Sequence, residues 1–220
     1  NETIEAMAED YANALRQVQP HGPYFIGGLC AGGYVAIEMA RLLRKEGIQV
    51  LPLLLIDMGL PFFSEQLTRD SYQGLSHWIR KRSAVGKIDF DLEDPRRWKG
   101  AAQVAASFGN ALVKYRPTPY DGPIFLLAST ARLRSAHGWG NPSTFNGVFS
   151  GKVICFEVGK SHGQVFDVHN KKFASIIKHC IEVVRSGKHD TDEPASVTLD
   201  TLFCATNEIR AALRRAPKWF

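Results

Sequence analysis

Long apolar runs are missing from this sequence of 220 residues, and so are paired cysteines, internal repeats and low-complexity tracts. No stretch approaches the roughly 18 consecutive apolar residues that a membrane-spanning helix needs. The N-terminus also lacks the basic and apolar pattern of a signal peptide. We therefore expect a cytoplasmic protein with no membrane partner.

Cysteine is scarce and scattered. The chain has 4 cysteines, and none of them forms a CxxC pair. This spacing excludes the usual zinc-binding pattern and a dense disulfide framework, so we expect reduced thiols and no metal site. We also expect no bound cofactor. The four are Cys30, Cys155, Cys180 and Cys204.

The chain has a basic balance without a basic block. Its formal net charge is +5, but Lys and Arg are spread along the sequence and no nucleic-acid-binding motif accompanies them. We therefore expect no nucleic-acid partner. A composition of 45% hydrophobic and 22% charged residues is typical of a globular domain with a substantial core.

The first third of the chain predicts a strand, a helix and a second strand. Residues 2–18 have the three- and four-residue spacing of an amphipathic helix. The apolar run 24–26 leads into a cluster of glycines, and helical spacing returns over 31–46. Residues 49–56 are nearly all apolar, as in a strand that is covered on both faces of a parallel sheet.

The remainder continues the alternation after an interruption. Residues 60–120 contain aromatic-rich helical stretches and no evident strand, which indicates an insertion. Strands are predicted at 123–128 and 152–158, and an amphipathic helix at 171–185. The pattern indicates an α/β class with four parallel strands. Residues 1–185 then form one domain, and 186–220 a linker and tail without a functional interpretation.

The glycine cluster holds the sequence Gly28-Leu29-Cys30-Ala31-Gly32, which fits the G-x-nucleophile-x-G pattern of a nucleophile elbow. We expect a side chain at Gly28 or at Gly32 to collide with a neighbouring element. The following helix would favour the Cys30 thiolate, and the Ala31 N–H would point toward a developing oxyanion. A buried structural cysteine in a tight turn is the alternative.

A thiol nucleophile needs a base and a group that orients the base. Asp57 follows the second strand, at the sheet edge where Cys30 is expected, although it could instead be a simple turn or cap residue. His162 follows the strand 152–158 at the same edge. His169 is the alternative base. The other histidines lack this setting: His21, His77, His137, His179 and His189.

With these residues in place, the chain resembles the thioesterase domains that release products from nonribosomal peptide and polyketide synthases, which have the α/β-hydrolase fold. The resemblance covers about residues 3–185. It rests on "TIEAMAEDYANALRQVQPHGPYFIGG", "AGGYVAIEMARLLRKEG", "LLLIDMGLP", "YRPTPYDGPIFLLAS" and "GKSHGQVF". In that family the acid follows the strand after the elbow helix, as Asp57 does here. The insertion 60–120 then corresponds to the family's helical lid.

The chain departs from the family pattern in two respects. Most members carry serine where this chain has Cys30, and the residues leave open whether the cysteine is natural or engineered. The family's N-terminal strands, and the glycine-rich loop that supplies a second oxyanion donor, have no counterpart here. We therefore expect a fragment or excised domain with an uncovered sheet edge, whose second donor lies in the missing segment.

The resemblance implies a Cys-His-Asp thioesterase that takes an acyl or peptidyl chain from the phosphopantetheine arm of a carrier protein. Release would be by cyclisation, giving a lactone, lactam or macrocycle, or by hydrolysis. Neither the substrate nor the oligomeric state follows from the sequence. Two other interpretations stay open: a hydrolase that resembles dienelactone hydrolase, and an inactive hydrolase fold that serves as a docking module.

Overall fold

A computed structural model describes residues 3–59, 107–134, 146–165 and 170–187. Within them, four strands form a single parallel sheet in sequence order. The α/β class and the four parallel strands are thereby confirmed. The strands are β1 (Gly27–Leu29), β2 (Leu53–Ile56), β3 (Ile124–Ser129) and β4 (Val153–Gly159).

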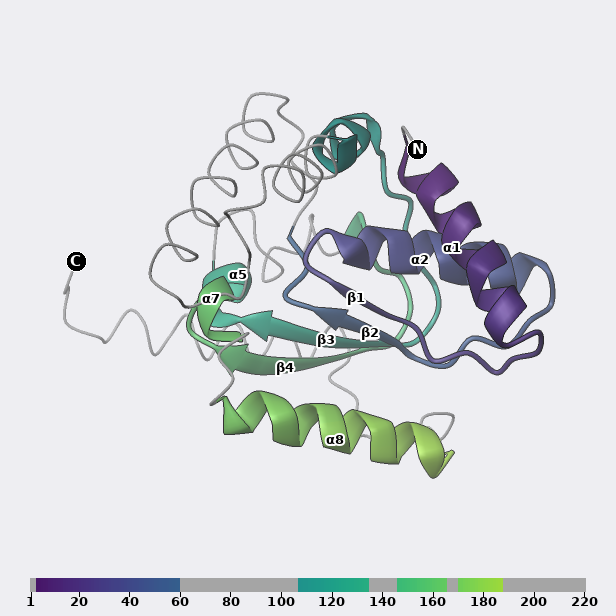
Figure 1. The fold of residues 1–220 in the computed structure, drawn as a ribbon. Coiled ribbons are helices and arrows are strands. Elements are labelled where there is room, and N and C mark those ends of the chain that lie inside the picture. Colours follow the sequence, from purple (N-terminus) through teal and green to yellow (C-terminus); the bar gives the residue numbers. More distant parts are fainter. Residues whose placement is uncertain (1–2, 60–106, 135–145, 166–169, 188–220) are drawn as a thin grey trace, which may run out of the picture.

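Long helices cover both faces of the sheet (Figure 1). α1 (Ile4–Val18) and α2 (Gly32–Lys45) pack together on one face, and α8 (Lys171–Arg185) lies on the other. The short helices α5 (Thr130–Arg134) and α7 (His162–Val165) both lie at the end toward which the strands point. That end is where open α/β sheets bind their ligands.

Alternation along β3 shows how the sheet separates two cores. Ile124, Leu126 and Ala128 belong to the cluster beneath α1 and α2, whereas Phe125 and Leu127 belong to the cluster on the α8 side. Successive side chains of a strand point to opposite faces, so a strand that is apolar at every position must be covered twice. This double covering fixes the register and therefore the positions of the strand ends.

The strand predicted at 24–26 lies just before β1, and the strand predicted at 49–56 is only partly right, because the ladder is interrupted near Pro52. Tyr24 forms an isolated parallel bridge with Val50, whereas Gly27 is paired with Leu54. The second segment therefore contains one extra residue between these two pairs. Proline has no N–H to contribute to a ladder and is commonly found at such bulges. Regular pairing is consequently confined to Gly27–Leu29 and Leu53–Ile56.

The other predicted elements agree closely with the structure, apart from those outside the described residues. The predicted helix 171–185 coincides with α8, and the predicted strands 123–128 and 152–158 shift by one residue. Most of the predicted lid, at 60–106, and the tail from residue 188 onward are outside the described part. The domain limits therefore stay a prediction. None of the helices in the described ranges is long and apolar enough to cross a membrane.

Candidate active site

Cys30 occupies a sharp turn between β1 and α2. Its backbone has φ 51°, which is the left-handed region that residues other than glycine seldom adopt. The turn is held in place because the Cys30 N–H donates to the Ile56 carbonyl at 2.8 Å and the Gly33 N–H donates to the Cys30 carbonyl at 3.1 Å. A strained strand-turn-helix geometry of this kind is the setting that a nucleophile elbow requires.

The steric prediction for the two elbow glycines is right at one position and wrong at the other. A Cβ at Gly28 would lie 2.5 Å from the Gly32 carbonyl oxygen and 2.5 Å from the Gly33 Cα. A Cβ at Gly32 would meet nothing within 4 Å. The main chain at Gly32 and Gly33 leaves no room for a side chain at position 28. Glycine is therefore required at Gly28 and not, for steric reasons, at Gly32.

Gly33 is a close-packed position that the sequence analysis missed. A Cβ there would overlap Sδ of Met58 and lie 2.8 Å from its Cγ. Met58 is fully buried directly after Asp57, so this contact fixes the start of α2 against the end of β2. The only sequence signal is the pair of adjacent glycines.

Gly33→Ala is expected to lower the free energy of unfolding by about 1–3 kcal/mol, because the buried Met58 side chain has to move to make room for the methyl group. Urea denaturation monitored by circular dichroism measures this change. Gly32→Ala is the matched control, and it should be close to neutral because its Cβ enters open space. Equal losses in the two variants would contradict the steric argument.

Asp57 directly follows β2 and has a fully buried side chain and a backbone φ of 41°. Its Oδ1 accepts the Ser129 N–H at 2.7 Å, and its Oδ2 lies 2.5 Å from Nδ1 of His162. Burial by itself would raise the pKa of this carboxyl group. The hydrogen bonds from His162 and Ser129 outweigh burial and hold the pKa below its ordinary value. Asp57 is therefore a buried carboxylate whose two oxygens are both engaged.

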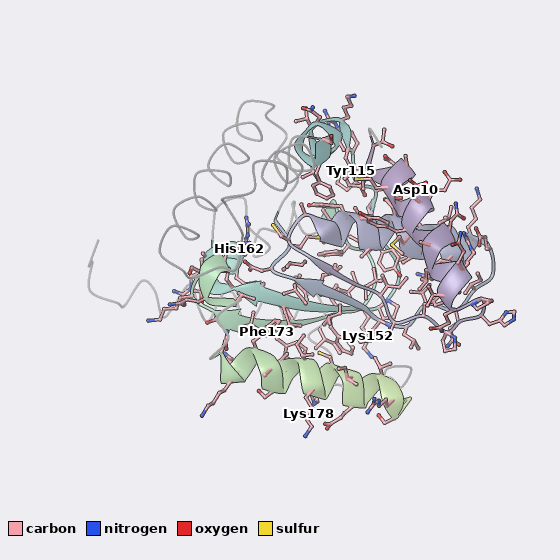
Figure 2. The ribbon with its side chains drawn as sticks, in the orientation of Figure 1. Asp10, Tyr115, Lys152, His162, Phe173 and Lys178 are labelled. Carbon is pink, nitrogen blue, oxygen red and sulfur yellow. The ribbon has the colours of Figure 1, made fainter. Side chains whose placement is uncertain are left out.

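His162 begins α7 at the carboxyl end of the sheet, where Figure 2 labels it. Its side chain is 45% exposed, so the ring is anchored to a buried acid on one side and accessible on the other. Hydrogen bonds to Asp57 and then to Cys30 raise the pKa of His162 to about 9, against the opposing effect of burial. The ring thus connects the carboxylate with the thiol.

The Cys30 thiol has a lowered pKa although it is partly buried. Burial raises the pKa, but the hydrogen bond and the charge of His162, the Ala31 N–H and the charge of Arg132 together bring it below the ordinary value. Cysteine reactivity depends on the thiolate, so this is the setting of a reactive thiol. Burial instead raises the pKa of Cys155 to about 12 and that of Cys180 to about 11.

The structure brings Cys30, His162 and Asp57, the three predicted triad residues, together from three separate segments, and their catalytic roles stay a prediction. His169, the alternative base, is outside the described residues. Ser129 was missed, although its place as the last residue of β3, at the same sheet edge, was a usable signal. Within the described ranges, no group of three or more His, Cys, Asp or Glu side chains could hold a metal ion.

Comparison with known families identifies the family of this chain. A family model described as Thioesterase domain matches residues 1–182. The chain belongs to the thioesterase domain family. A thioesterase acts on thioesters, and a nucleophile, a histidine and an acid in hydrogen-bonded order are a recurring arrangement for acyl transfer.

The curated relatives are far longer than this thioesterase domain. Malpibaldin synthetase of Mortierella alpina is 27% identical over 165 residues, which are 73% of this chain and 3% of that protein. Non-reducing polyketide synthase men2 of Menisporopsis theobromae is 40% identical over 124 residues, 53% of this chain and 6% of the relative. The chain therefore spans only a small part of the relatives it matches.

Solved structures share the fold of this thioesterase domain at low sequence identity. The NocB thioesterase domain from the nocardicin cluster has a TM-score of 0.60 and 24% identity, over 83% of this chain and 75% of that one. The surfactin-cyclising thioesterase domain SrfTE has a TM-score of 0.60 and 19% identity, over 79% and 74%. These likenesses confirm the predicted α/β-hydrolase fold.

Proposed function

We propose that this domain releases an acyl or peptidyl chain from the phosphopantetheine thioester of a carrier protein, through a covalent acyl-enzyme on Cys30. The observation that carries the proposal is the hydrogen-bonded series from the Cys30 thiol through His162 to the buried Asp57. Both curated relatives described above are synthases or synthetases, which supports a carrier-bound substrate.

In the first half-reaction, His162 takes the proton of Cys30, and the thiolate attacks the thioester carbonyl carbon. The Ala31 N–H, which already hydrogen-bonds the sulfur, stabilises the oxyanion of the tetrahedral intermediate. Collapse breaks the carbon–sulfur bond to pantetheine, and His162 returns its proton to the leaving thiolate. A second oxyanion donor, expected from the resemblance, stays a prediction.

In the second half-reaction, His162 takes a proton from the incoming water, amine or hydroxyl as this group attacks the acyl-enzyme. The bond to the Cys30 sulfur then breaks, and the sulfur leaves as thiolate or regains the proton. Asp57 orients the ring in both halves and stabilises its charged form. Because the acyl-enzyme is a thioester, it stays reactive toward an internal amine or hydroxyl, which favours cyclisation alongside hydrolysis.

Intact-protein mass spectrometry after addition of an acyl-N-acetylcysteamine thioester tests the proposed function. We expect a mass increase of one acyl group, which peptide mapping assigns to Cys30. Hydrolysis of a small enol-lactone without any reaction with the thioester would favour the enzyme that resembles dienelactone hydrolase. The absence of both reactions would favour the inactive docking module.

The thiol itself is expected to direct the fate of the acyl group. With a substrate that carries an internal amine, the Cys30 enzyme should give a higher ratio of cyclic to linear product than Cys30→Ser, because an ester intermediate is less reactive toward amines. Liquid chromatography with mass spectrometry measures the ratio. Equal ratios would show that the sulfur has no such role.

A further inference from the structure

A permanent cation lies beside the candidate site and was not anticipated from the sequence. Arg132 is on α5, directly after β3, and its Nε lies 3.9 Å from Oδ2 of Asp57. The guanidinium group rests over Gly59, where an added Cβ would be 3.3 Å from Nη2. The Arg132 side chain is 29% exposed, so it is partly withdrawn from water.

The geometry favours a role through charge over one through a hydrogen bond. At 3.9 Å the closest approach of Arg132 to Asp57 is too long for a hydrogen bond. His162 Nδ1 already occupies the same Oδ2 at 2.5 Å. Arg132 therefore places a positive charge beside the Asp57 carboxylate, whereas the hydrogen bonds that orient this carboxylate come from other residues.

The net charge of the candidate site changes during the proposed reaction, and a fixed cation would offset part of this change. Asp57 is negative and fully buried, and His162 compensates for it only while the ring is protonated. When Cys30 is also a thiolate, the three side chains carry a net charge of −1. Arg132 brings the sum of these charges to neutrality, which reduces the cost of holding uncompensated charge next to the buried Asp57.

We propose that Arg132 is a positioning residue of this site, whose fixed charge keeps Asp57 ionised while His162 is neutral and favours the thiolate of Cys30. The inference rests on the proposed function, since it assigns a further residue to the same site. Its experimental signature is nevertheless a property of the thiol and does not require turnover.

The groups around Cys30 support this assignment. His162 faces it from α7, Asp57 lies behind His162 at the end of β2, and Tyr34 faces it from α2. Burial raises the pKa of Tyr34 well above its ordinary value, so this phenol stays neutral. The charge of Arg132 acts to lower the pKa of both Cys30 and Tyr34. A fixed cation lowers the pKa of every neighbouring group, so its removal raises them all.

The pH dependence of Cys30 alkylation by iodoacetamide tests the proposal. The thiolate displaces iodide and forms a carbon–sulfur bond, and peptide mapping separates Cys30 from the other cysteines. The measured quantity is the midpoint pH at which the alkylation rate of Cys30 reaches half of its maximum. In Arg132→Gln we expect this midpoint to move upward by about 0.5–1 pH unit, which makes alkylation roughly three- to tenfold slower at pH values below it. Arg132→Lys should recover at least half of the shift.

The matched control is Arg134→Gln, which removes the same charge from an exposed position of the same helix. It should leave the midpoint unchanged. An unchanged midpoint in Arg132→Gln, an equal shift in Arg134→Gln, or a loss of alkylation at every pH would each overturn the proposal. Thermal unfolding by circular dichroism verifies that the variants are folded.

The two proposals fail in distinguishable ways. If thioesters do not acylate Cys30 but the alkylation midpoint still moves in Arg132→Gln, the proposed function is wrong and the electrostatic role of Arg132 stands. If acylation occurs and the midpoint does not move, the enzyme is a thioesterase in which Arg132 has no such role.

Discussion

Cys30→Ala is expected to abolish the acyl-enzyme completely. The proposed mechanism has one nucleophile, and alanine cannot form a bond to the acyl group. Intact-protein mass spectrometry after addition of the acyl thioester should therefore show the unmodified mass at every time point. Cys30→Ser should still accept the acyl group, as an ester, if the turn presents a hydroxyl as it presents the thiol.

Cys155→Ala is the matched control for this first experiment. It also removes one thiol, but from a cysteine on β4 whose pKa burial raises to about 12. Acylation should continue at its normal rate in this variant. A persistent acyl adduct in Cys30→Ala, with its site on another cysteine, would contradict the assignment of Cys30.

Asp57→Asn is expected to slow acylation by roughly 10³- to 10⁴-fold near pH 7, the size of effect known when the acid of a Ser-His-Asp triad is replaced by its amide. The amide has no charge to stabilise the imidazolium, and its NH₂ group can favour the wrong ring tautomer. The fold should tolerate the change, since asparagine adopts positive φ readily and its oxygen can still accept the Ser129 N–H. Loss of thioester absorbance with time measures the rate.

The same variant should shift the titration of His162. The hydrogen bond to Asp57 is the largest contribution that raises the pKa of this ring to about 9, so Asp57→Asn should move the pKa down toward the ordinary value. Nuclear magnetic resonance titration of the ring protons follows this change. Asp121→Asn makes the same chemical change at an exposed carboxylate paired with Arg44, and should alter neither rate nor titration. A normal rate in Asp57→Asn would refute the triad.

Much of the fold was predictable because periodicity is a local property of the chain. α8 was predicted with its observed bounds, since its apolar spacing is regular and Asn170 caps its first turn by accepting the Phe173 N–H at 3.0 Å. The interruption near Pro52 was not predicted, because it is a mismatch between two segments and becomes defined only when they pair.

The candidate site also contains residues that could be predicted from the sequence and residues that could not. Cys30, Asp57 and His162 each follow a strand at the carboxyl edge of a parallel sheet, and their residue types suit their positions, so sequence order was sufficient to select them as candidates. Gly33 and Arg132 depend on what lies opposite them. The contact of Gly33 with Met58 and the position of Arg132 over Gly59 join segments whose spatial relation only the folded chain defines.

The left-handed backbone at Cys30 has a consequence for which residue types the site can accept at this position during evolution. Main-chain torsions and the hydrogen bond from the Cys30 N–H to the Ile56 carbonyl orient the Cys30 side chain, so no side-chain atom of that residue is needed to build the turn. The scaffold can therefore exchange sulfur for oxygen without being rebuilt. Selection at this position can act on reactivity alone, while the architecture around it is inherited intact.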